Sequence, residues 1–380
     1  MTEPDRPVSL LDRRTLILGA SALSVTACAG QVPSLDELPD PNAPDPLARY
    51  RLSTSDDADA WMRHLDPSRM RGGPDMLALS GGGEDGAFGA GALNGWTSHG
   101  SRPEFDLVTG ISTGALIAPF AFAGPEHDTA LKQIFTQHGP DDILRLRGLR
   151  GLLNDSLYDV KPMANLIAKY TSADVLNAVA ARHAEGARLF VVTSNLDTGK
   201  GTVWNMGALA SDGQYELFRE VMRASSALPG LFPPVTLQYG TEGRTVRETH
   251  IDGGVNMQLL AVPPAAFSGP ARRGNGGHLY VVINNTLDPS PQPVARNVMS
   301  ISQRALTTMI RSSAAETVRS ARLFSQQSDL DLSVASIAQE SGITFDPGAR
   351  FDQQYMQQLF AHGYDRAARG ALWGNLPNTI

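Results

Sequence analysis

Residues 106–120, Asp-Leu-Val-Thr-Gly-Ile-Ser-Thr-Gly-Ala-Leu-Ile-Ala-Pro-Phe, decide the fold. The first half is a short β-like run, the second half is a helix of small residues, and Ser112 lies at the break. Glycines at positions 110 and 114 complete the pattern Gly-x-Ser-x-Gly, which is typical of a sharp strand-to-helix turn that exposes a hydroxyl group. The helix that follows directs N–H groups and its positive dipole end at whatever the serine attacks. Ser112 is therefore a candidate nucleophile, although this short pattern alone also fits an ordinary β-to-α turn.

A glycine-rich loop follows an earlier predicted strand. Residues 76–79 form an apolar run between Pro74 and a glycine cluster, which predicts a buried parallel strand. Gly81, Gly82 and Gly83 come next and lead into a predicted helix. Consecutive N–H groups in such a loop stabilise a developing negative charge, and glycine allows close approach of a substrate. We therefore expect an oxyanion hole beside the serine turn, because the two turns follow successive strands.

The same loop has a second interpretation as a dinucleotide site. Residues 81–86 satisfy the pattern Gly-x-Gly-x-x-Gly between a strand and a helix. The acidic residue expected about 20 positions further on would be Glu104 or Asp106. Asp106 leads directly into the Ser112 turn, where the ribose of the cofactor would compete with the nucleophile. We therefore favour the oxyanion hole and expect no cofactor.

An acidic partner for the serine occurs at Asp252. Residues 249–252 predict the end of a strand, and two glycines follow the carboxylate directly. Aspartate with a pKa of about 3.9 is a poor base unless burial raises that pKa, so histidine alternatives stay open. The chain order Ser, Asp, His would use His278 or His362, and His250 lies on the same strand face as Asp252.

The remaining patterns complete an α/β chain. Residues 188–196 predict a strong strand that forms a hairpin with residues 202–205, and residues 279–284 predict another buried strand. Apolar residues at helical spacing, expected to face the core, occur in residues 163–170, 294–309 and 351–359. The fold class predicted is a three-layer α/β/α architecture with a largely parallel central sheet.

Composition excludes several classes of function. The 380 residues are 42% hydrophobic and 19% charged, which is ordinary for a soluble globular protein. A net charge of −7 without a dense basic stripe gives no support to a nucleic-acid partner. No metal-ligand spacing of cysteine or histidine occurs, and the single cysteine, Cys28, excludes an intramolecular disulfide.

The first 28 residues resemble an export signal. Arg13 and Arg14 precede an apolar stretch over residues 16–27, which is shorter than the roughly 20 residues that span a bilayer. Val-Thr-Ala-Cys at residues 25–28 looks like a bacterial lipobox, in which Cys28 is lipidated, and the paired arginines resemble a twin-arginine signal. A plain cleaved signal with an incidental cysteine is the alternative.

A Pro- and Asp-rich segment over residues 29–57 predicts an extended tether after this signal. Several acyl chains on Cys28 would attach the protein firmly to a membrane. We therefore expect an exported lipoprotein of the bacterial cell envelope, at the outer membrane and facing the periplasm or the surface. The globular domain would cover residues 58–380.

Taken together, the motifs resemble the patatin-like phospholipase family. The family's glycine loop is similar to residues 81–86, its Gly-x-Ser-x-Gly elbow to residues 110–114 and its Asp-Gly-Gly motif to residues 252–254. Two intervening segments, residues 193–199 and 224–234, are also similar. The resemblance covers a motif core over residues 76–260, and a helical C-terminal part over residues 290–370 follows it.

This resemblance implies a Ser112–Asp252 dyad without histidine and oxyanion N–H groups from Gly82 and Gly83. It also implies a phospholipid or another acyl ester as substrate. One departure is Asp85, which occupies a position where the family often has Arg or Lys. We expect the carboxylates of Glu84 and Asp85 to cap the following helix and to point away from the site.

The function predicted is serine-dependent hydrolysis of lipid acyl esters. Three alternatives stay open: a Ser-His-Asp esterase or acyltransferase, a non-catalytic periplasmic lipoprotein with a hydrolase fold, and a nucleotide-dependent oxidoreductase.

Overall fold

The structure is a computed structural model. It describes residues 38, 43–66, 68, 73–145, 158–159, 161–241, 244–261, 276–287, 293–296, 298–338, 341–346 and 348–374. The predicted signal with Cys28, and the tether as far as residue 37, lie outside the described residues, so they stay predictions.

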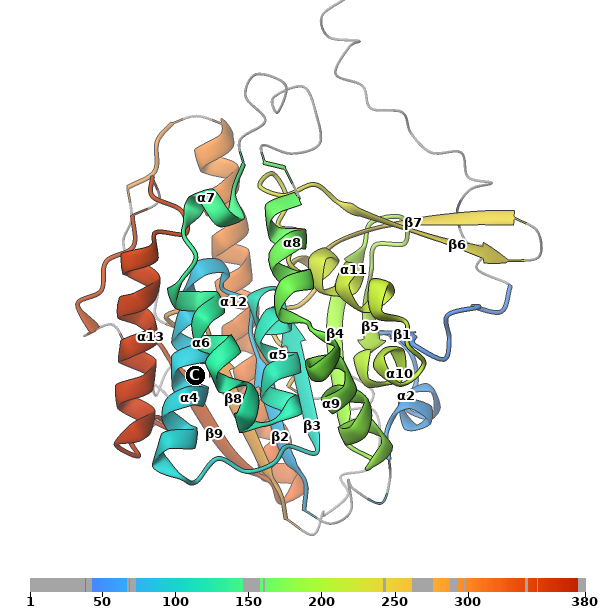
Figure 1. The fold of residues 1–380 in the computed structure, drawn as a ribbon, viewed down its shortest axis with the longest axis horizontal. Helices are drawn as coiled ribbons and strands as arrows, with labels where there is room; N and C mark the ends of the chain where they lie inside the picture. Colours follow the sequence, from blue (N-terminus) through green and yellow to red (C-terminus); the bar gives the residue numbers. More distant parts are fainter. Residues whose placement is uncertain are drawn as a thin grey trace, which may run out of the picture.

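Five parallel strands form the centre of the sheet, in the order β4-β3-β2-β8-β9 (Figure 1). In that order they are β4 (Arg188–Asn195), β3 (Leu107–Ile111), β2 (Asp75–Leu79), β8 (His278–Ile283) and β9 (Asp331–Ser336). The strands β3, β4 and β8 are apolar and mostly buried, as expected for a sheet covered on both faces.

Antiparallel strands extend one side of this sheet. β5 (Lys200–Asn205) forms the predicted hairpin with β4, and β1 (Arg51–Ser53) pairs with β5. β1 falls inside the segment predicted as a tether, so the folded part begins earlier than residue 58. The physical reason is that β1 covers the edge of β5 and buries Arg51 in an ion pair with Glu248.

A second hairpin, β6 (Val235–Thr241) and β7 (Arg244–Asp252), projects from the sheet (Figure 1). Only the end of β7 is predicted by the sequence. β7 runs antiparallel to β4 and pairs with its last three residues.

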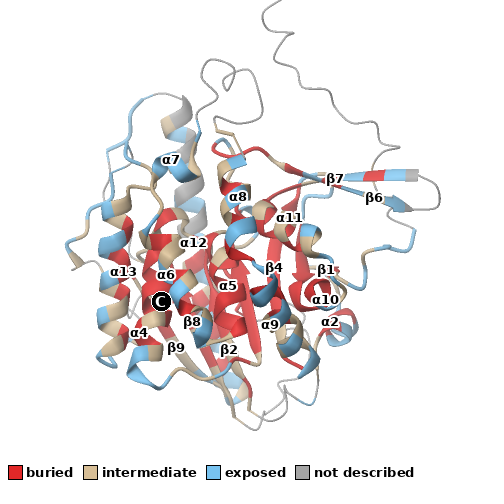
Figure 2. Ribbon diagram, viewed as in Figure 1, coloured by how far each residue is buried: buried red, intermediate tan, exposed pale blue. Residues whose placement is uncertain are grey.

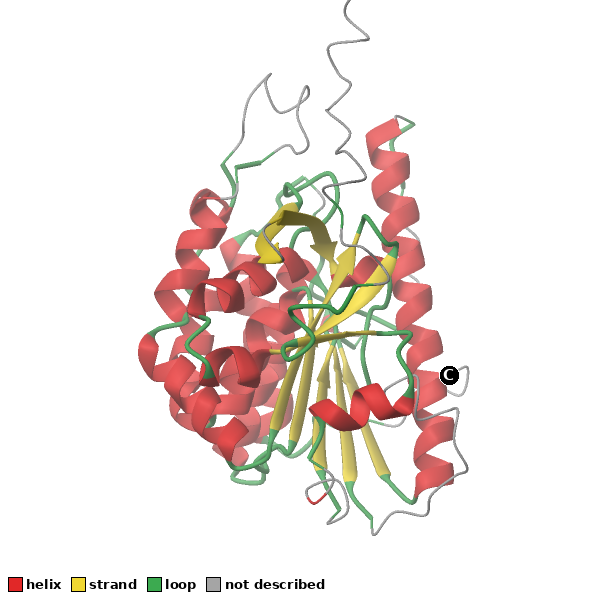
Figure 3. Cartoon of the chain, turned by 90° about the vertical axis from the view of Figure 1, so that its right-hand side faces the viewer, coloured by secondary structure: helices red, strands yellow, loops and turns green. Residues whose placement is uncertain are grey.

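Helices cover both faces of the sheet, which confirms the three-layer prediction (Figure 3). One face carries α4 (Gly86–His99), α5 (Thr113–Ala123), α6 (Asp128–Thr136), α8 (Lys161–Tyr170), α9 (Ala173–Ala184), α10 (Met206–Ser211), α11 (Tyr215–Ser225) and α13 (Gln353–Ala368). The other face carries α2 (Ala58–His64) and α12 (Val298–Ser328). Figure 2 shows the buried residues concentrated in the sheet and in the helix surfaces that face it.

Close packing brings the C-terminal helix onto α4. A Cβ atom on Gly91 would lie 2.0 Å from the Phe360 carbonyl oxygen, and one on Gly95 would lie 2.2 Å from the Tyr364 carbonyl oxygen. Only glycine permits this approach of the two backbones. As a result, the chain just before α13 lies over the start of α4, where the glycine loop ends.

The C-terminal part differs from its prediction. The helical segment over residues 290–370 also contains β9. Ile301 and Met309 are 54% and 67% exposed, so the prediction that residues 294–309 face the core is wrong. The physical reason is that the N-terminal half of α12 extends past the parallel strands (Figure 3), whereas Val318 and Ala321 pack on the sheet.

Candidate active site

The serine turn requires both of its glycines. A Cβ atom on Gly114 would lie 2.3 Å from the Leu79 carbonyl oxygen, and one on Gly110 would lie 2.4 Å from the Gly114 carbonyl oxygen. Ser112 itself has φ 55° and ψ −124°, a conformation that L-residues rarely adopt. Such strain persists where the surroundings impose it and is concentrated at functional sites. The Ser112 N–H donates to Ser225 Oγ at 3.0 Å, which helps to hold the turn.

The register of β4 brings the serine and the aspartate together. β4 pairs with β3 as far as Val192, which lies opposite Ile111, and then pairs with β7 from Thr193, which lies opposite Asp252. The carboxyl ends of β3 and β7 therefore meet head to head beside β4. Ser112 Oγ donates a hydrogen bond to Asp252 Oδ2 at 2.6 Å.

Burial tunes the aspartate. Asp252 is 2% exposed, and its Oδ1 accepts a hydrogen bond from the Gly254 N–H at 2.8 Å. Burial raises the pKa of Asp252 to about 6, although the hydrogen bonds from Ser112 and Gly254 lower it. A carboxylate with this pKa is a stronger base than an exposed aspartate and is still ionised at neutral pH.

Backbone donors gather beside Ser112. Gly83 begins the short 3₁₀ helix η2 (Gly83–Asp85) with φ 61°, and Thr113 begins α5. The first N–H groups of a helix have no partner inside that helix. Gly82 cannot be replaced without a clash, since a Cβ atom there would lie 2.0 Å from the Asn284 carbonyl oxygen. Gly82, Gly83 and Thr113 line the same cavity as Ser112, so their N–H groups are the candidate oxyanion donors.

Gly81 departs from its prediction as an oxyanion residue. Its N–H donates to the Gln258 carbonyl oxygen at 3.3 Å, so this donor is already used. Gly81 instead provides space, because a Cβ atom there would lie 3.0 Å from Ser112 Cβ.

Asn284 anchors the glycine loop, and sequence reasoning missed it. It is fully buried at the end of β8, and its side-chain amide donates to the Ser80 carbonyl oxygen at 2.8 Å. The Asn284 backbone N–H donates to Ser80 Oγ at 2.8 Å, and the Gly89 N–H donates to Asn284 Oδ1 at 3.1 Å. The only local signal is a polar residue directly after an apolar strand.

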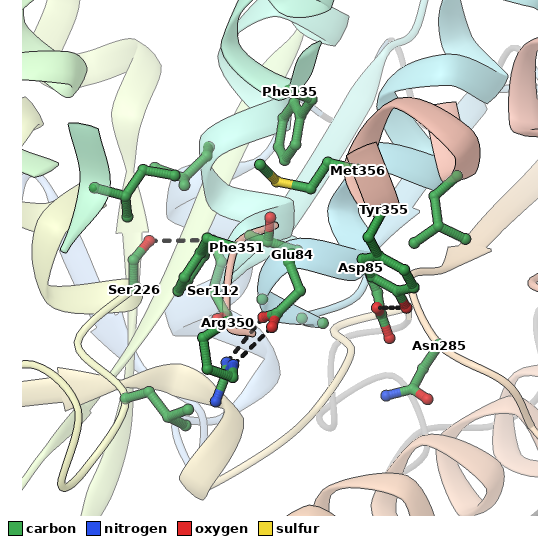
Figure 4. A pocket seen from close by; sticks show the side chains of 18 of the residues that line it. Glu84, Asp85, Ser112, Phe135, Ser226, Asn285, Arg350, Phe351, Tyr355 and Met356 are labelled. Atoms are coloured by element: carbon green, nitrogen blue, oxygen red, sulfur yellow. Dashed lines mark hydrogen bonds and ion pairs between the residues drawn. The ribbon is translucent and has the colours of Figure 1, made fainter. Parts of the chain in front are cut away.

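The prediction that Glu84 and Asp85 cap the helix is wrong. Arg350 donates to both carboxylate oxygens of Glu84, at 2.6 and 2.8 Å, and the Tyr355 hydroxyl donates to Asp85 Oδ1 at 2.6 Å (Figure 4). Both carboxylates therefore point toward the part of the chain that contains Arg350 and the start of α13. Arg350 Nη2 would lie 3.6 Å from a Cβ atom on Gly83. The glycine loop has an aspartate at position 85 where the family often has Arg or Lys, but Arg350, which is 266 residues from Glu84 in the sequence, places a cation beside the loop.

These groups open into a cavity of about 1080 Å³. Ser112 and Asp252 line it together with the glycine loop. Most of the wall is apolar and comes from α5, α6, α8, α11, the loop after α11 and the C-terminal segment over residues 341–359; examples are Leu116, Phe120, Phe135, Met163, Ile167 and Phe232. Among the described lining residues, Arg350 is the one lysine or arginine.

Two of the three histidine alternatives are bound elsewhere. His278 is the first residue of β8, at the amino edge of the sheet and opposite to the serine turn, and its Nε2 shares a hydrogen bond with Ser333 Oγ at 2.7 Å. His250 is fully buried, with Nδ1 2.9 Å from Thr193 Oγ1 and Nε2 3.2 Å from Glu248 Oε2. Neither ring lines the cavity.

The third alternative, His362, also lies away from the cavity. It is on α13, and its ring centroid lies 6.1 Å from that of Phe88. Sequence reasoning did not select His138, which does line the cavity. Its Nε2 shares a hydrogen bond with the Tyr170 hydroxyl at 2.8 Å, and its Nδ1 lies 3.4 Å from Asp142. The structure therefore brings Ser112 together with an aspartate and not with a predicted histidine.

The geometry does not favour the dinucleotide interpretation. Asp106 Oδ2 accepts a hydrogen bond from the Asp75 N–H at 3.0 Å, at the amino end of β3 and across the sheet from the glycine loop. Gly86 serves helix packing, since a Cβ atom there would lie 2.2 Å from Thr113 Oγ1.

The described residues contain no cluster of three or more His, Cys, Asp or Glu side chains arranged to hold a metal ion. Within the same part of the chain, no helix has both the length and the apolar character needed to cross a membrane.

The chain is an α/β protein that presents a serine, a buried acid and a glycine loop at the carboxyl edge of its sheet. Residues 77–263 match the profile of the family described as patatin-like phospholipase. This part of the chain therefore belongs to the patatin-like phospholipase family, which confirms the resemblance of its motifs.

Comparison with solved structures adds the crystal structure of VipD from Legionella pneumophila. The two chains are 13% identical with a TM-score of 0.37, and the match covers 78% of this chain and 66% of that chain. No curated protein matches this chain.

Proposed function

We propose that this protein is a serine-dependent hydrolase of lipid acyl esters. The observation that carries the proposal is the 2.6 Å hydrogen bond from Ser112 Oγ to the buried Asp252, at the wall of a large apolar cavity. The patatin-like phospholipase family supports a lipid ester as the class of substrate.

In the proposed acylation step, Ser112 Oγ attacks the ester carbonyl carbon and its proton passes to Asp252. The N–H groups of Gly82, Gly83 and Thr113 stabilise the oxyanion that forms. The tetrahedral intermediate then collapses, and the alcohol leaves with the proton from Asp252. The acyl group remains on Ser112 as an ester.

The apolar wall supports a long acyl chain as the group that is bound. Burial of each methylene contributes about 0.8 kcal/mol, so affinity should rise with chain length until the cavity is filled. The predicted lipid anchor at Cys28 would hold this cavity near a bilayer, and we extend the proposal to a membrane-attached lipoprotein of the bacterial cell envelope.

The test uses the full chain purified in detergent micelles, with p-nitrophenyl esters of increasing chain length and a fluorogenic phospholipid. Ser112→Ala should lower turnover by about a thousandfold or more. The matched control is Ser211→Ala, at the exposed end of α10, which should keep the original rate. If the unchanged protein hydrolyses none of these esters, the alternative of a non-catalytic lipoprotein is favoured.

A further inference from the structure

Gln258 has a backbone and a side chain that serve different parts of the site. The residue follows the turn η5 (Gly253–Val255), which begins directly after Asp252, and it is only 3% exposed. Its carbonyl oxygen accepts the hydrogen bond from the Gly81 N–H and so holds the glycine loop. Its side chain lines the same cavity as Ser112.

Two motif glycines leave room for the Gln258 amide. A Cβ atom on Gly81 would lie 2.9 Å from Gln258 Nε2, and one on Gly254 would lie 3.1 Å from Gln258 Oε1. The same two Cβ positions lie 3.0 Å from Ser112 Cβ and 3.0 Å from Asp252 Oδ1, respectively. The amide nitrogen therefore lies at most about 6 Å from Ser112 Cβ, and the amide oxygen at most about 6 Å from Asp252 Oδ1, so a single water molecule can reach the amide and either residue.

The Gln258 side-chain amide is a polar group on the cavity wall. Within the described residues, the hydrogen bond given for Gln258 uses its backbone carbonyl oxygen and not this amide. Buried side-chain amides are paired in most proteins, because an unpaired one loses its hydration without compensation. A side-chain amide offers two donors and an acceptor, so an occupant of the cavity is the natural partner.

We infer that Gln258 holds the acyl acceptor, a water molecule in hydrolysis, against the acyl ester of Ser112. This inference rests on the proposed function. The oxyanion already has donors in Gly82, Gly83 and Thr113, whereas Gln258 is next to Gly254, on the side of the base. An acceptor must lie beside the base, because its proton is transferred there.

The step assigned to this group is deacylation. The water oxygen, with one hydrogen bond to the Gln258 amide, forms a bond to the acyl carbonyl carbon while its proton passes to Asp252. The tetrahedral intermediate then collapses, the bond from that carbon to Ser112 Oγ breaks, and Ser112 Oγ takes the proton back from Asp252. A carboxylic acid leaves, and the serine is regenerated.

The first experiment measures acylation and deacylation separately in the full chain. Gln258→Met keeps the length of the side chain and removes its hydrogen bonds, and the matched control is Gln238→Met on the exposed face of β6. With a p-nitrophenyl ester, the Gln258 variant should show a normal burst of p-nitrophenolate followed by turnover about tenfold slower than that of the unchanged protein, as expected for one lost hydrogen bond. Intact-protein mass spectrometry of quenched samples should show accumulated acyl-Ser112.

A second variant keeps the inference testable if the first does not fold. Gln258→Asn retains the amide but withdraws it by one methylene, which leaves room for a larger acceptor. In the presence of methanol, this variant should produce a higher ratio of methyl ester to free acid than the unchanged protein does. A purely structural role would slow both products and leave their ratio unchanged.

The outcomes of these experiments distinguish the role of Gln258 from the proposed hydrolase function. Equal slowing of the burst and of turnover, without accumulated acyl-Ser112, would overturn the inference in favour of an oxyanion or structural role. Unchanged turnover in a folded Gln258→Met variant would also overturn it, while Ser112-dependent hydrolysis would leave the proposed function standing. If the unchanged protein forms no acyl-Ser112 with any ester, both claims fail.

Discussion

Replacing the buried carboxylate of Asp252 with an amide should inactivate the protein and, at the same time, increase its free energy of unfolding. Burial raises the pKa of Asp252 from 3.8 to about 6, and this gap corresponds to about 3 kcal/mol. The folded state binds the proton more tightly than the unfolded state, so the stabilisation is fully present below pH 3.8 and is lost as the pH rises through 6. Asp252→Asn removes this loss of stability, because an asparagine side chain does not ionise as the pH rises. At pH 8 the variant should therefore be about 3 kcal/mol more stable than the unchanged protein, and at pH 4 the two should differ little.

Urea unfolding at both pH values measures the difference, with the fluorescence of the buried Trp61 and Trp204 as the signal. The control is Asp141→Asn, an exposed residue in the first turn of α7 (Pro140–Ile143), which should show no such pH dependence. An Asp252→Asn variant that is no more stable than the unchanged protein at pH 8, or that is stabilised equally at pH 4, would show that burial does not raise the pKa of Asp252 in this way.

Three further predictions concern the turn, the ion pair and the histidine alternative. Gly114→Ala places a Cβ atom 2.3 Å from the Leu79 carbonyl oxygen, so it should lower the melting temperature and abolish ester turnover; a variant that keeps both would contradict the packing described here. Arg350→Ala leaves the buried Glu84 unpaired and should lower the free energy of unfolding by about 2 to 3 kcal/mol, whereas adding Glu84→Gln should restore most of it in urea titrations. His278→Gln should keep full turnover of p-nitrophenyl esters and the same pH–rate profile, and a large loss in this assay would favour a catalytic triad.

The central part of the site could be predicted because its requirements are local in sequence. A serine between two close-packed glycines, and an aspartate directly before two more, mark the ends of strands that meet at one edge. The hairpin of β4 and β5 was also predictable, since its two strands are joined by the short turn at residues 196–199. What the patterns did not contain is the pairing of β7 with the end of β4, which determines that Ser112 and Asp252 touch.

The residues that were missed act over long distances in the sequence. Arg350 lies 266 residues from Glu84, and Asn284 lies 204 residues from Ser80, so no local spacing signals either contact. The exposure of Ile301 was unpredictable for a related reason. Its helical spacing is regular, but how far a helix extends beyond the sheet depends on the length of the strands it covers.

The measurement that tests the dyad most directly is the rate at which a fluorophosphonate modifies Ser112 as a function of pH, located by peptide mass spectrometry. We expect a single modification at Ser112, with a rate that falls as the pH decreases through about 6 because Asp252 becomes protonated. The reaction should be lost in Asp252→Asn and unchanged in His278→Gln. Modification at another residue, or a rate that survives Asp252→Asn and depends on a histidine, would exclude the Ser112–Asp252 dyad.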